Sequence, residues 1–378
     1  MACSVKEFVR QHEKELVDLT CQITLIPAPS RHEDARAAFC AQWLRDRGAK
    51  DVYIDADKNV VCPICQGRSG KWIVVSAHMD TVFPFDTPLE IRREGDRLYC
   101  PGIGDDSANL AILMIGMRWL LENPPVGNEH GILFVATAAE EVGSVGMRGF
   151  VDRFGAENIY RCYSFDACNN RLYIGTVNYY KYVITVRTPG GHALGKFGMP
   201  SAIEELAKVM LETSRNCREY IAQNELKRTT INVGTFHGGE RSNIIASEAQ
   251  MLLELRSDTL ARMQVLEGYL QDAMAHYRSE NVQITAERMA DAAHWSTVEE
   301  AVMEELGKEH YAMMHSFGLD PRISKACTDC RYPMHKGIPS LDVGLCYTVG
   351  PHTKEEYLVP DSLPTGLELL LTILQSVL

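Results

Sequence analysis

The chain reads KWIVVSAHMD at residues 71–80, and this segment predicts a strand at the centre of its fold. Trp72 to Val75 form a short apolar run rich in β-branched residues, which is typical of a strand buried on both faces of a parallel sheet. His78 and Asp80 follow at its end. Residues i and i+2 of an extended chain point the same way, so both side chains should leave the sheet together at its carboxyl edge. Open α/β sheets bind ligands at that edge, although a surface His and Asp after a strand would give the same pattern.

Composition indicates a folded protein of about two domains, since 378 residues exceed the size of one ordinary core. The 46% hydrophobic and 23% charged residues are typical of globular chains. A formal net charge of -12 disfavours nucleic acid and anionic membrane surfaces as partners. The acidity suits a soluble protein, and it would also suit one that binds cations.

The N-terminal residues, MACSVKEFVRQHEKEL, lack the long apolar core of a signal peptide, and no window reaches the ~18 apolar residues of a membrane span. We therefore expect a cytoplasmic protein without membrane contact. The 12 cysteines include Cys21, Cys40, Cys162 and Cys346 in apparent core segments, which favours reduced, buried thiols.

Four cysteines form two CxxC pairs, Cys62 with Cys65 and Cys327 with Cys330. A shared structural zinc site is one reading, but the pairs are much farther apart in sequence than those of a compact zinc ribbon. The sequence leaves their role open.

The first part of the chain alternates helices and strands, which predicts an α/β fold with a central, mostly parallel sheet and helices on both faces. Ser4 can cap a first helix that runs to about Ile26. Ser30 and Glu33 form a capping box before a second helix that stops near Gly48. An apolar helix over 108–121 and two buried-strand runs over 131–137 and 160–165 follow.

Carboxylates stand at the ends of these elements. Asp105 and Asp106 open the apolar helix, Glu140 and Glu141 follow one strand run, and Asp166 follows the next. Each has an ordinary alternative, because acidic residues also cap helices and fill solvated loops. At one sheet edge they would repel one another unless a cation compensated them. Together with His78 they suit a hydrolytic zinc, manganese or cobalt centre, and a bridging carboxylate would suit two metals.

A second domain is predicted from the change of pattern after Asp166. Strands around 179–187, 230–235, 249–255 and 283–288, with helices at 202–213 and 261–276, give a βαββαβ order typical of a small α+β domain. We expect residues 1–178 and 290–378 to form the first domain and residues 179–289 to form the inserted one. Near the C-terminus, His352 lies in a loop before the last helix, where it would supply the nitrogen ligand that a second metal otherwise lacks.

Six motifs in order resemble those of a known family, the dinuclear-zinc metallopeptidases that include aminoacylase, carnosinase, glutamate carboxypeptidases and peptidase T. They are His78-Met79-Asp80, Gly104-Asp105-Asp106, Glu140-Glu141, Asp166, Gly191-His192 and His352. The resemblance spans almost the whole chain. It implies a zinc-exopeptidase-like catalytic domain and an inserted lid or dimerisation domain, hence a homodimer.

The resemblance also implies roles for individual residues. Asp105 would bridge two divalent ions, of zinc or else of manganese or cobalt. His78 and Asp166 would complete one metal site, and Glu141 and His352 would complete the other. Asp80 would orient His78, and Glu140 would be the general base. In the inserted domain His192 would stabilise the tetrahedral intermediate across the dimer, while Asn243 and Arg256 would bind substrate, Arg256 by clamping a carboxylate.

The implied activity is hydrolysis of an amide bond in small peptides, as by a peptidase T-like exopeptidase. An N-acyl amino acid deacylase is the alternative within the family, and a non-catalytic binding protein on the same fold is the alternative of another class. Three positions depart from the family pattern, at Ser107, at Ala246 and over residues 325–329. We expect these positions to lie near the pocket that selects the substrate.

Overall fold

The computed structural model describes residues 4–289 and 294–378, which fold as two compact units. Unit 2 comprises Val177–Trp295, and unit 1 comprises the chain before and after it. The first predicted domain boundary, at 178/179, lies two residues from the observed one. The second, at 289/290, falls where residues 290–293 lie outside the described part of the chain.

Unit 1 is built on an eight-stranded sheet in the order β1-β2-β6-β3-β7-β16-β8-β15. Parallel pairing joins β6 to β3, β3 to β7, β7 to β16 and β8 to β15. The pairs β1–β2, β2–β6 and β16–β8 are antiparallel. Its strands are β1 (Tyr53–Ile54), β2 (Val60–Cys65), β3 (Trp72–His78), β6 (Gly131–Thr137), β7 (Ile159–Ser164), β8 (Arg171–Thr176), β15 (Arg322–Ala326) and β16 (Ser340–Val343).

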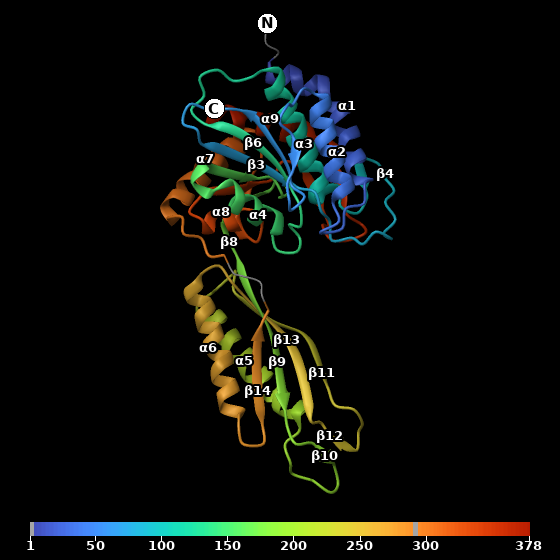
Figure 1. Ribbon diagram of the computed structural model, residues 1–378, viewed down its shortest axis with the longest axis vertical. Coiled ribbons are helices and arrows are strands. Elements are labelled where there is room, and N and C mark those ends of the chain that lie inside the picture. Colours follow the sequence, from blue (N-terminus) through green and yellow to red (C-terminus); the bar gives the residue numbers. More distant parts are fainter. Residues whose placement is uncertain (1–3, 290–293) are drawn as a thin grey trace. The chain divides into compact units, whose positions relative to one another are not determined.

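Helices cover both faces of this sheet (Figure 1). They are α1 (Val5–Thr24), α2 (Asp34–Asp46), α3 (Asn109–Glu122), α4 (Val145–Phe154), α7 (Glu300–Ser316), α8 (Arg331–His335) and α9 (Leu363–Val377). Alternate residues of β3 enter different cores: Ile73 and Val75 pack with α1, α2, α3 and α9, whereas Val74 packs with α4. This period of two confirms that β3 is buried on both faces.

The parallel strands β3, β6 and β7 end together at one edge of the sheet. His78 pairs in register with Thr137, and Ser76 pairs with Ser164. The short turn η1 (Ile103–Ala108) enters α3, and a small antiparallel sheet, ordered β17-β18-β5-β4, lies within the same unit. Its strands are β4 (Arg92–Glu94), β5 (Arg97–Tyr99), β17 (Tyr347–Val349) and β18 (Tyr357–Val359).

Unit 2 has the predicted βαββαβ order. Its four-stranded antiparallel sheet, ordered β11-β13-β9-β14, packs against α5 and α6 around its own core, and β10 pairs with β12. Its elements are β9 (Asn178–Arg187), β10 (Gly191–His192), α5 (Ala202–Gln223), β11 (Thr230–Gly238), β12 (Ile244–Ile245), β13 (Glu248–Ser257), α6 (Leu260–Tyr277) and β14 (Gln283–Arg288). The predicted fold class is confirmed.

Among the described residues, none of the helices combines the length and the apolar character needed to cross a membrane.

A buried arginine ties the first two helices to the central strand. Arg36 of α2 is 1% exposed, and its guanidinium donates to the carbonyl oxygens of Ile26 at 2.7 Å and Met79 at 2.7 Å. Met79 lies between His78 and Asp80, so this contact fixes the backbone at the carboxyl end of β3.

Replacing Arg36 with Met should destabilise unit 1, because two carbonyl groups would remain buried without their donor. We expect the free energy of unfolding to fall by about 2–5 kcal/mol in denaturant titrations. Arg10→Met, at an exposed position of α1, is the matched control and should change it by less than about 0.5 kcal/mol. Equal stability of the two variants would show that Arg36 does not hold this strand end.

Candidate metal centre

The carboxylate of Asp105 lies between two imidazoles. Its Oδ1 is 2.9 Å from Nε2 of His78, and its Oδ2 is 3.1 Å from Nε2 of His352. Asp105 lies in η1, and its peptide bond to Asp106 is cis. The two oxygens of one carboxylate therefore face two different groups of side chains.

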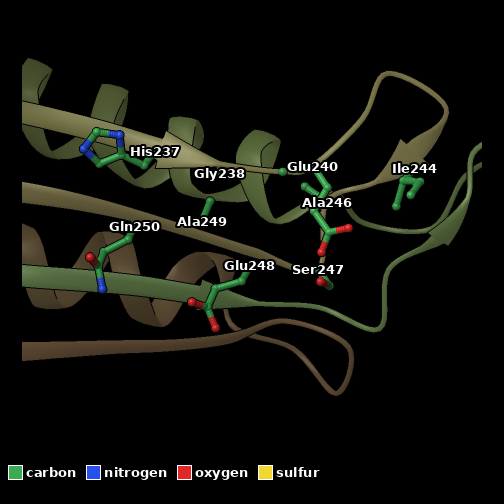
Figure 2. Close-up of a pocket in the computed structure, with 10 residues that line it drawn as sticks. His237, Gly238, Glu240, Ile244, Ala246, Ser247, Glu248, Ala249 and Gln250 are labelled. Atoms are coloured by element: carbon green, nitrogen blue, oxygen red, sulfur yellow. The ribbon is translucent and has the colours of Figure 1, made fainter.

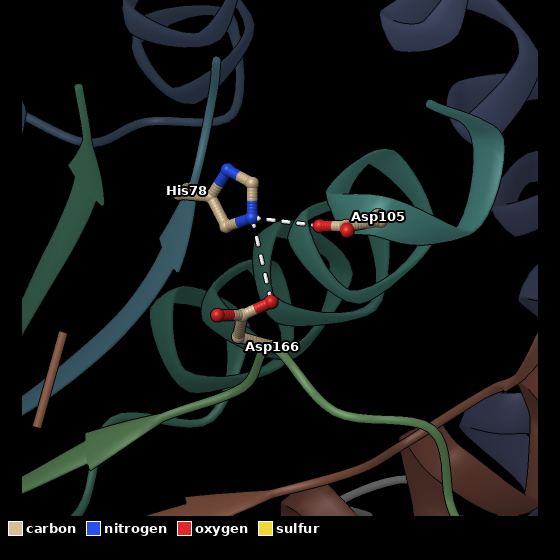
Figure 3. A group of neighbouring side chains, drawn as sticks. All are labelled: His78, Asp105 and Asp166. Carbon is tan, nitrogen blue, oxygen red and sulfur yellow. Dashed lines mark hydrogen bonds and ion pairs between the residues drawn. The ribbon is translucent and has the colours of Figure 1, made fainter. Parts of the chain in front are cut away.

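The first group is His78, Asp105 and Asp166 (Figure 3). His78 ends β3 and is 1% exposed, and Asp166 stands two residues after β7. His78 Nε2 is 3.4 Å from Asp166 Oδ1. Adjacent parallel strands thus bring together residues that are 88 positions apart in sequence (166 − 78).

The second group is Asp105, Glu141 and His352. His352 Nε2 lies 2.9 Å from Glu141 Oε1. Glu141 follows β6, whereas His352 lies in the loop between β17 and β18, with a positive φ of 65° and a half-exposed side chain. The second group is therefore more open to solvent than the first.

The donor set fits two divalent cations. In each group the candidate ligand atoms all lie within 4.8 Å of one another. Tetrahedral zinc with bonds of 2.0–2.1 Å places its ligand atoms about 3.4 Å apart, close to the separations seen here. Three carboxylates and two imidazoles would also balance most of the charge of two such ions. Neither group contains a cysteine, so among the described residues neither CxxC pair supplies a ligand to this centre.

The protonation of the side chains reflects this crowding of charge. Burial would lower the pKa of His78, but Asp166, Asp105 and Asp80 together raise it well above its usual range. The hydrogen bond to Asp105, opposed by burial, raises the pKa of His352 to about 9. Burial raises the pKa of Glu141 to about 7, and the nearby Asp105 adds to it. Imidazolium groups thus supply positive charge that bound cations would replace.

Asp80 holds the segment that carries the two glutamates. Its Oδ1 accepts from the backbone N–H of Glu140 at 2.9 Å, and its Oδ2 accepts from that of Glu141 at 3.2 Å. His78 Nδ1 is 3.0 Å from the Asp80 carbonyl oxygen and 3.5 Å from its carboxylate. The buried carboxylate of Asp80 therefore contacts the backbones of Glu140 and Glu141 and the ring of His78.

A cavity of about 490 Å³ opens over these residues. Its walls include Asp105, Glu140, Glu141, Asp166 and His352. That volume lies within the range of sites for small molecules. Burial, reinforced by Asp166, raises the pKa of Glu140 well above its usual range.

Comparison with known proteins gives the family. Residues 74–376 match Peptidase family M20/M25/M40. The chain belongs to this family. Its membership confirms the resemblance inferred from the six motifs.

One curated relative and two solved structures show how far the similarity extends. The chain is 27% identical over 262 residues to a protein of Trichophyton verrucosum named "Probable carboxypeptidase", covering 62% of this chain and 56% of the relative. It thus spans little more than half of that relative's length. The aminopeptidase PepT of Bacillus cereus superposes with a TM-score of 0.78 at 21% identity, over 97% of this chain and 98% of the other. A Bacillus subtilis structure described as a dinuclear metal-binding M20 peptidase gives a TM-score of 0.69 at 13% identity, over 97% and 99%.

Two residues of this M20 chain make contacts that differ from those predicted. The expected capping box of Ser30 and Glu33 is wrong, because α2 begins at Asp34 and no side chain caps it. Ser30 Oγ instead donates to Asp80 Oδ2 at 2.7 Å. Glu33 Oε1 accepts from the N–H of Arg31 at 2.6 Å and of Ala139 at 3.0 Å. Both side chains therefore support the metal centre instead of the helix.

Sequence reasoning assigned no role to two further carboxylates. Asp106 Oδ2 accepts from the N–H of His78 at 2.9 Å, and its Oδ1 accepts from Asn109 at 2.8 Å. Glu356 is fully buried and accepts three backbone N–H groups at 2.8 Å, from Gly102, Gly104 and Asp105. The acidic run after His352 was the available signal, but nothing in it identified its target.

The predicted substrate-binding residues His192, Asn243 and Arg256 all belong to unit 2. His192 pairs with Ile244 where β10 meets β12, and Asn243 immediately precedes β12. Arg256 lies in β13 and pairs with Tyr179 near the start of β9. Its Nε donates to Glu254 at 2.6 Å. Their roles in this M20 chain stay predictions.

A separate hollow of about 330 Å³ lies in unit 2 beside β11 and β13 (Figure 2). Glu240, Glu248 and His237 line it, and Glu248 is paired with Arg187 at 2.8 Å. No group of candidate metal ligands occurs here among the described residues. The candidate metal ligands of the described residues all lie in unit 1.

Glu356→Gln should weaken metal binding, because an amide cannot accept from all three N–H groups that position Asp105. We expect a loss of about 10- to 100-fold in metal affinity, measured by competition with a chelator. Glu355→Gln is the matched control. The Glu355 side chain, next in sequence to Glu356, is 78% exposed and contacts only Arg92 among the described ion pairs. Unchanged affinity in a folded Glu356→Gln protein would contradict this role.

Proposed function

We propose that the protein is a two-metal exopeptidase that hydrolyses an amide bond in small peptides, as peptidase T does. The observation that carries the proposal is the carboxylate of Asp105, whose two oxygens face the two ligand groups at the floor of one cavity. Glu140 lines the same cavity without belonging to either group. A site for two ions with a spare carboxyl beside it suits activation of water.

His78, Asp105 and Asp166 would hold one ion, and Asp105, Glu141 and His352 the other. Zinc is the proposed metal, with manganese or cobalt as alternatives that the same ligands accept. Bound ions would supply Lewis acidity, which polarises the scissile carbonyl and lowers the pKa of the attacking water. Asp80 keeps His78 and the Glu140 backbone in place for this chemistry.

Glu140 would accept the proton of the attacking water and pass it to the leaving amine. A buried carboxyl with a raised pKa can carry this proton between the two steps. In unit 2, His192 would stabilise the oxyanion of a partner protomer, while Asn243 and Arg256 would bind the substrate. We propose a homodimer on these grounds.

The size of the cavity supports a short substrate, a di- or tripeptide or an N-acyl amino acid. Similarity to an aminopeptidase and to a carboxypeptidase leaves two directions of attack. A panel of tripeptides, dipeptides, their N-acylated forms and N-acyl amino acids distinguishes them. An aminopeptidase needs a free amino terminus, whereas a carboxypeptidase or a deacylase does not.

Glu140→Gln should abolish turnover without releasing the metal. We expect about two ions per chain in both proteins, and a fall in kcat of about 10²- to 10⁴-fold in the variant. Metal analysis and hydrolysis of the substrate panel, after reconstitution with zinc, manganese or cobalt, measure both quantities. Glu129→Gln, on the surface before β6, should match the unaltered protein in both.

Fewer than two ions per chain, or full activity of Glu140→Gln, would refute this assignment. Removal of metal with a chelator should stop hydrolysis, and restored metal should recover it. Hydrolysis that survives complete removal of the metal would exclude the two-metal mechanism.

The proposed role of His192 across a dimer can be tested by mixing two inactive variants. Combined in equal amounts and exchanged, His192→Ala and Glu140→Gln should regain about one quarter of full activity, because half of the dimers contain one intact site. Each variant exchanged with itself is the control. No recovery in verified mixed dimers would show that His192 does not act on the partner's site.

A further inference from the structure

The charges around the catalytic cavity are uneven. Its walls carry four carboxylates, those of Asp105, Glu140, Glu141 and Asp166. Arg171 is the one arginine or lysine among the described residues that line it. A peptide has an ammonium end and a carboxylate end, and the guanidinium of Arg171 attracts the carboxylate end.

The backbone of Arg171 is held firmly. It opens β8, five residues after the predicted ligand Asp166 (171 − 166), and pairs in parallel with Arg322 of β15. Its N–H donates to the carbonyl oxygen of Cys168 at 2.8 Å. A rigid strand start is a good support for a side chain that must bind in a defined place.

The side chain of Arg171 is half-buried, yet it forms no ion pair or hydrogen bond with any residue in the described part of the chain. The nearest acidic residue in sequence, Asp166, is engaged with His78 at 3.4 Å. A guanidinium has five N–H donors and matches the geometry of a carboxylate. Donors left over inside a binding cavity are available to a ligand.

Arg256, the other candidate for this task, has a different environment. Its Nε donates to Glu254 at 2.6 Å, and its guanidinium lies 5.7 Å from the ring centroid of Tyr179. It thus has a carboxylate partner within its own unit. The two arginines differ in whether an acidic neighbour already occupies the guanidinium.

We propose that Arg171 binds the free terminal carboxylate of the substrate and thereby selects peptide acids over peptide amides. This inference rests on the proposed hydrolase function and assigns the substrate class of that same site. A bidentate pair with the carboxylate would orient the scissile bond relative to Glu140 and the Asp105 centre.

The test compares each peptide with its C-terminal amide, using unaltered protein, Arg171→Met and Arg171→Lys. We expect Arg171→Met to raise KM for the acid by about 10- to 100-fold and to leave KM for the amide within about twofold. Arg171→Lys should raise KM for the acid by less, because a lysine ammonium keeps the positive charge but cannot form the bidentate pair of a guanidinium. Metal content and unfolding curves verify that each variant is folded.

Arg322→Met is the matched control, since Arg322 pairs in register with Arg171 but does not line the cavity. It should keep the preference for acids. An unchanged preference in Arg171→Met, or a loss confined to Arg256→Met, would overturn the proposal. Loss of preference only for peptides with Asp or Glu side chains would also overturn it, because the recognised carboxylate would then not be the terminal one.

Binding measurements separate this inference from the hydrolase proposal. Calorimetry on metal-loaded Glu140→Gln, with and without Arg171→Met, compares acid and amide without turnover. Tighter binding of the acid that depends on Arg171 would support the inference even if no amide were cleaved. Equal binding of both ligands would refute it even in an active hydrolase.

Discussion

Unit 1 depends on keeping many carboxylates close together at the carboxyl edge of a parallel sheet. Burial alone favours the protonated form of each, and their mutual repulsion adds to this effect. The pKa values of Asp106, Glu140 and Asp342 are raised in this way, first by burial and then by neighbours that include Asp166. Such a group is stable only where hydrogen-bond donors or cations face the oxygens, and two divalent ions meet that need economically.

The carboxylates divide into two kinds according to what faces them. Asp80, Asp106 and Glu356 accept backbone N–H groups, and each fixes a segment that carries a predicted ligand. Asp105, Glu141 and Asp166 turn their oxygens toward imidazoles and the cavity. The first kind satisfies orphaned amides at strand and helix ends, which would otherwise be costly to bury. The second kind is left free to bind metal.

The strand ends of this site could be predicted because they follow from local pattern. An apolar run followed by His78 and Asp80 predicts a buried strand with two polar side chains at its carboxyl end, and parallel neighbours then place Asp166 beside it. Helix ends were less predictable: α5 continues to Gln223 instead of stopping at Thr213, since no glycine or proline interrupts the segment and Cys217 packs in the core.

Long-range hydrogen bonds could not be predicted at all. Glu356 binds the N–H of Gly102 across 254 residues, and no periodicity in either segment points to the other. The same holds for Ser30, whose local pattern with Glu33 predicted a cap, although Asp80 is its partner in the folded chain. Local signals describe elements, whereas the positioning of the ligands is a tertiary property.

The positions that depart from the family pattern illustrate why the substrate is harder to infer than the metal centre. Ser107 does not line the cavity: its hydroxyl donates to the carbonyl oxygen of Gly102 at 2.7 Å and closes the turn before α3. Ala326, Cys327 and Thr328 do line it. Three of the five predicted ligands, His78, Glu141 and Asp166, end or follow buried strands that the sequence pattern predicts. The walls that meet the substrate come from loops and strand starts without a repeating pattern, so each of their residues has to be located in the structure before its role can be argued.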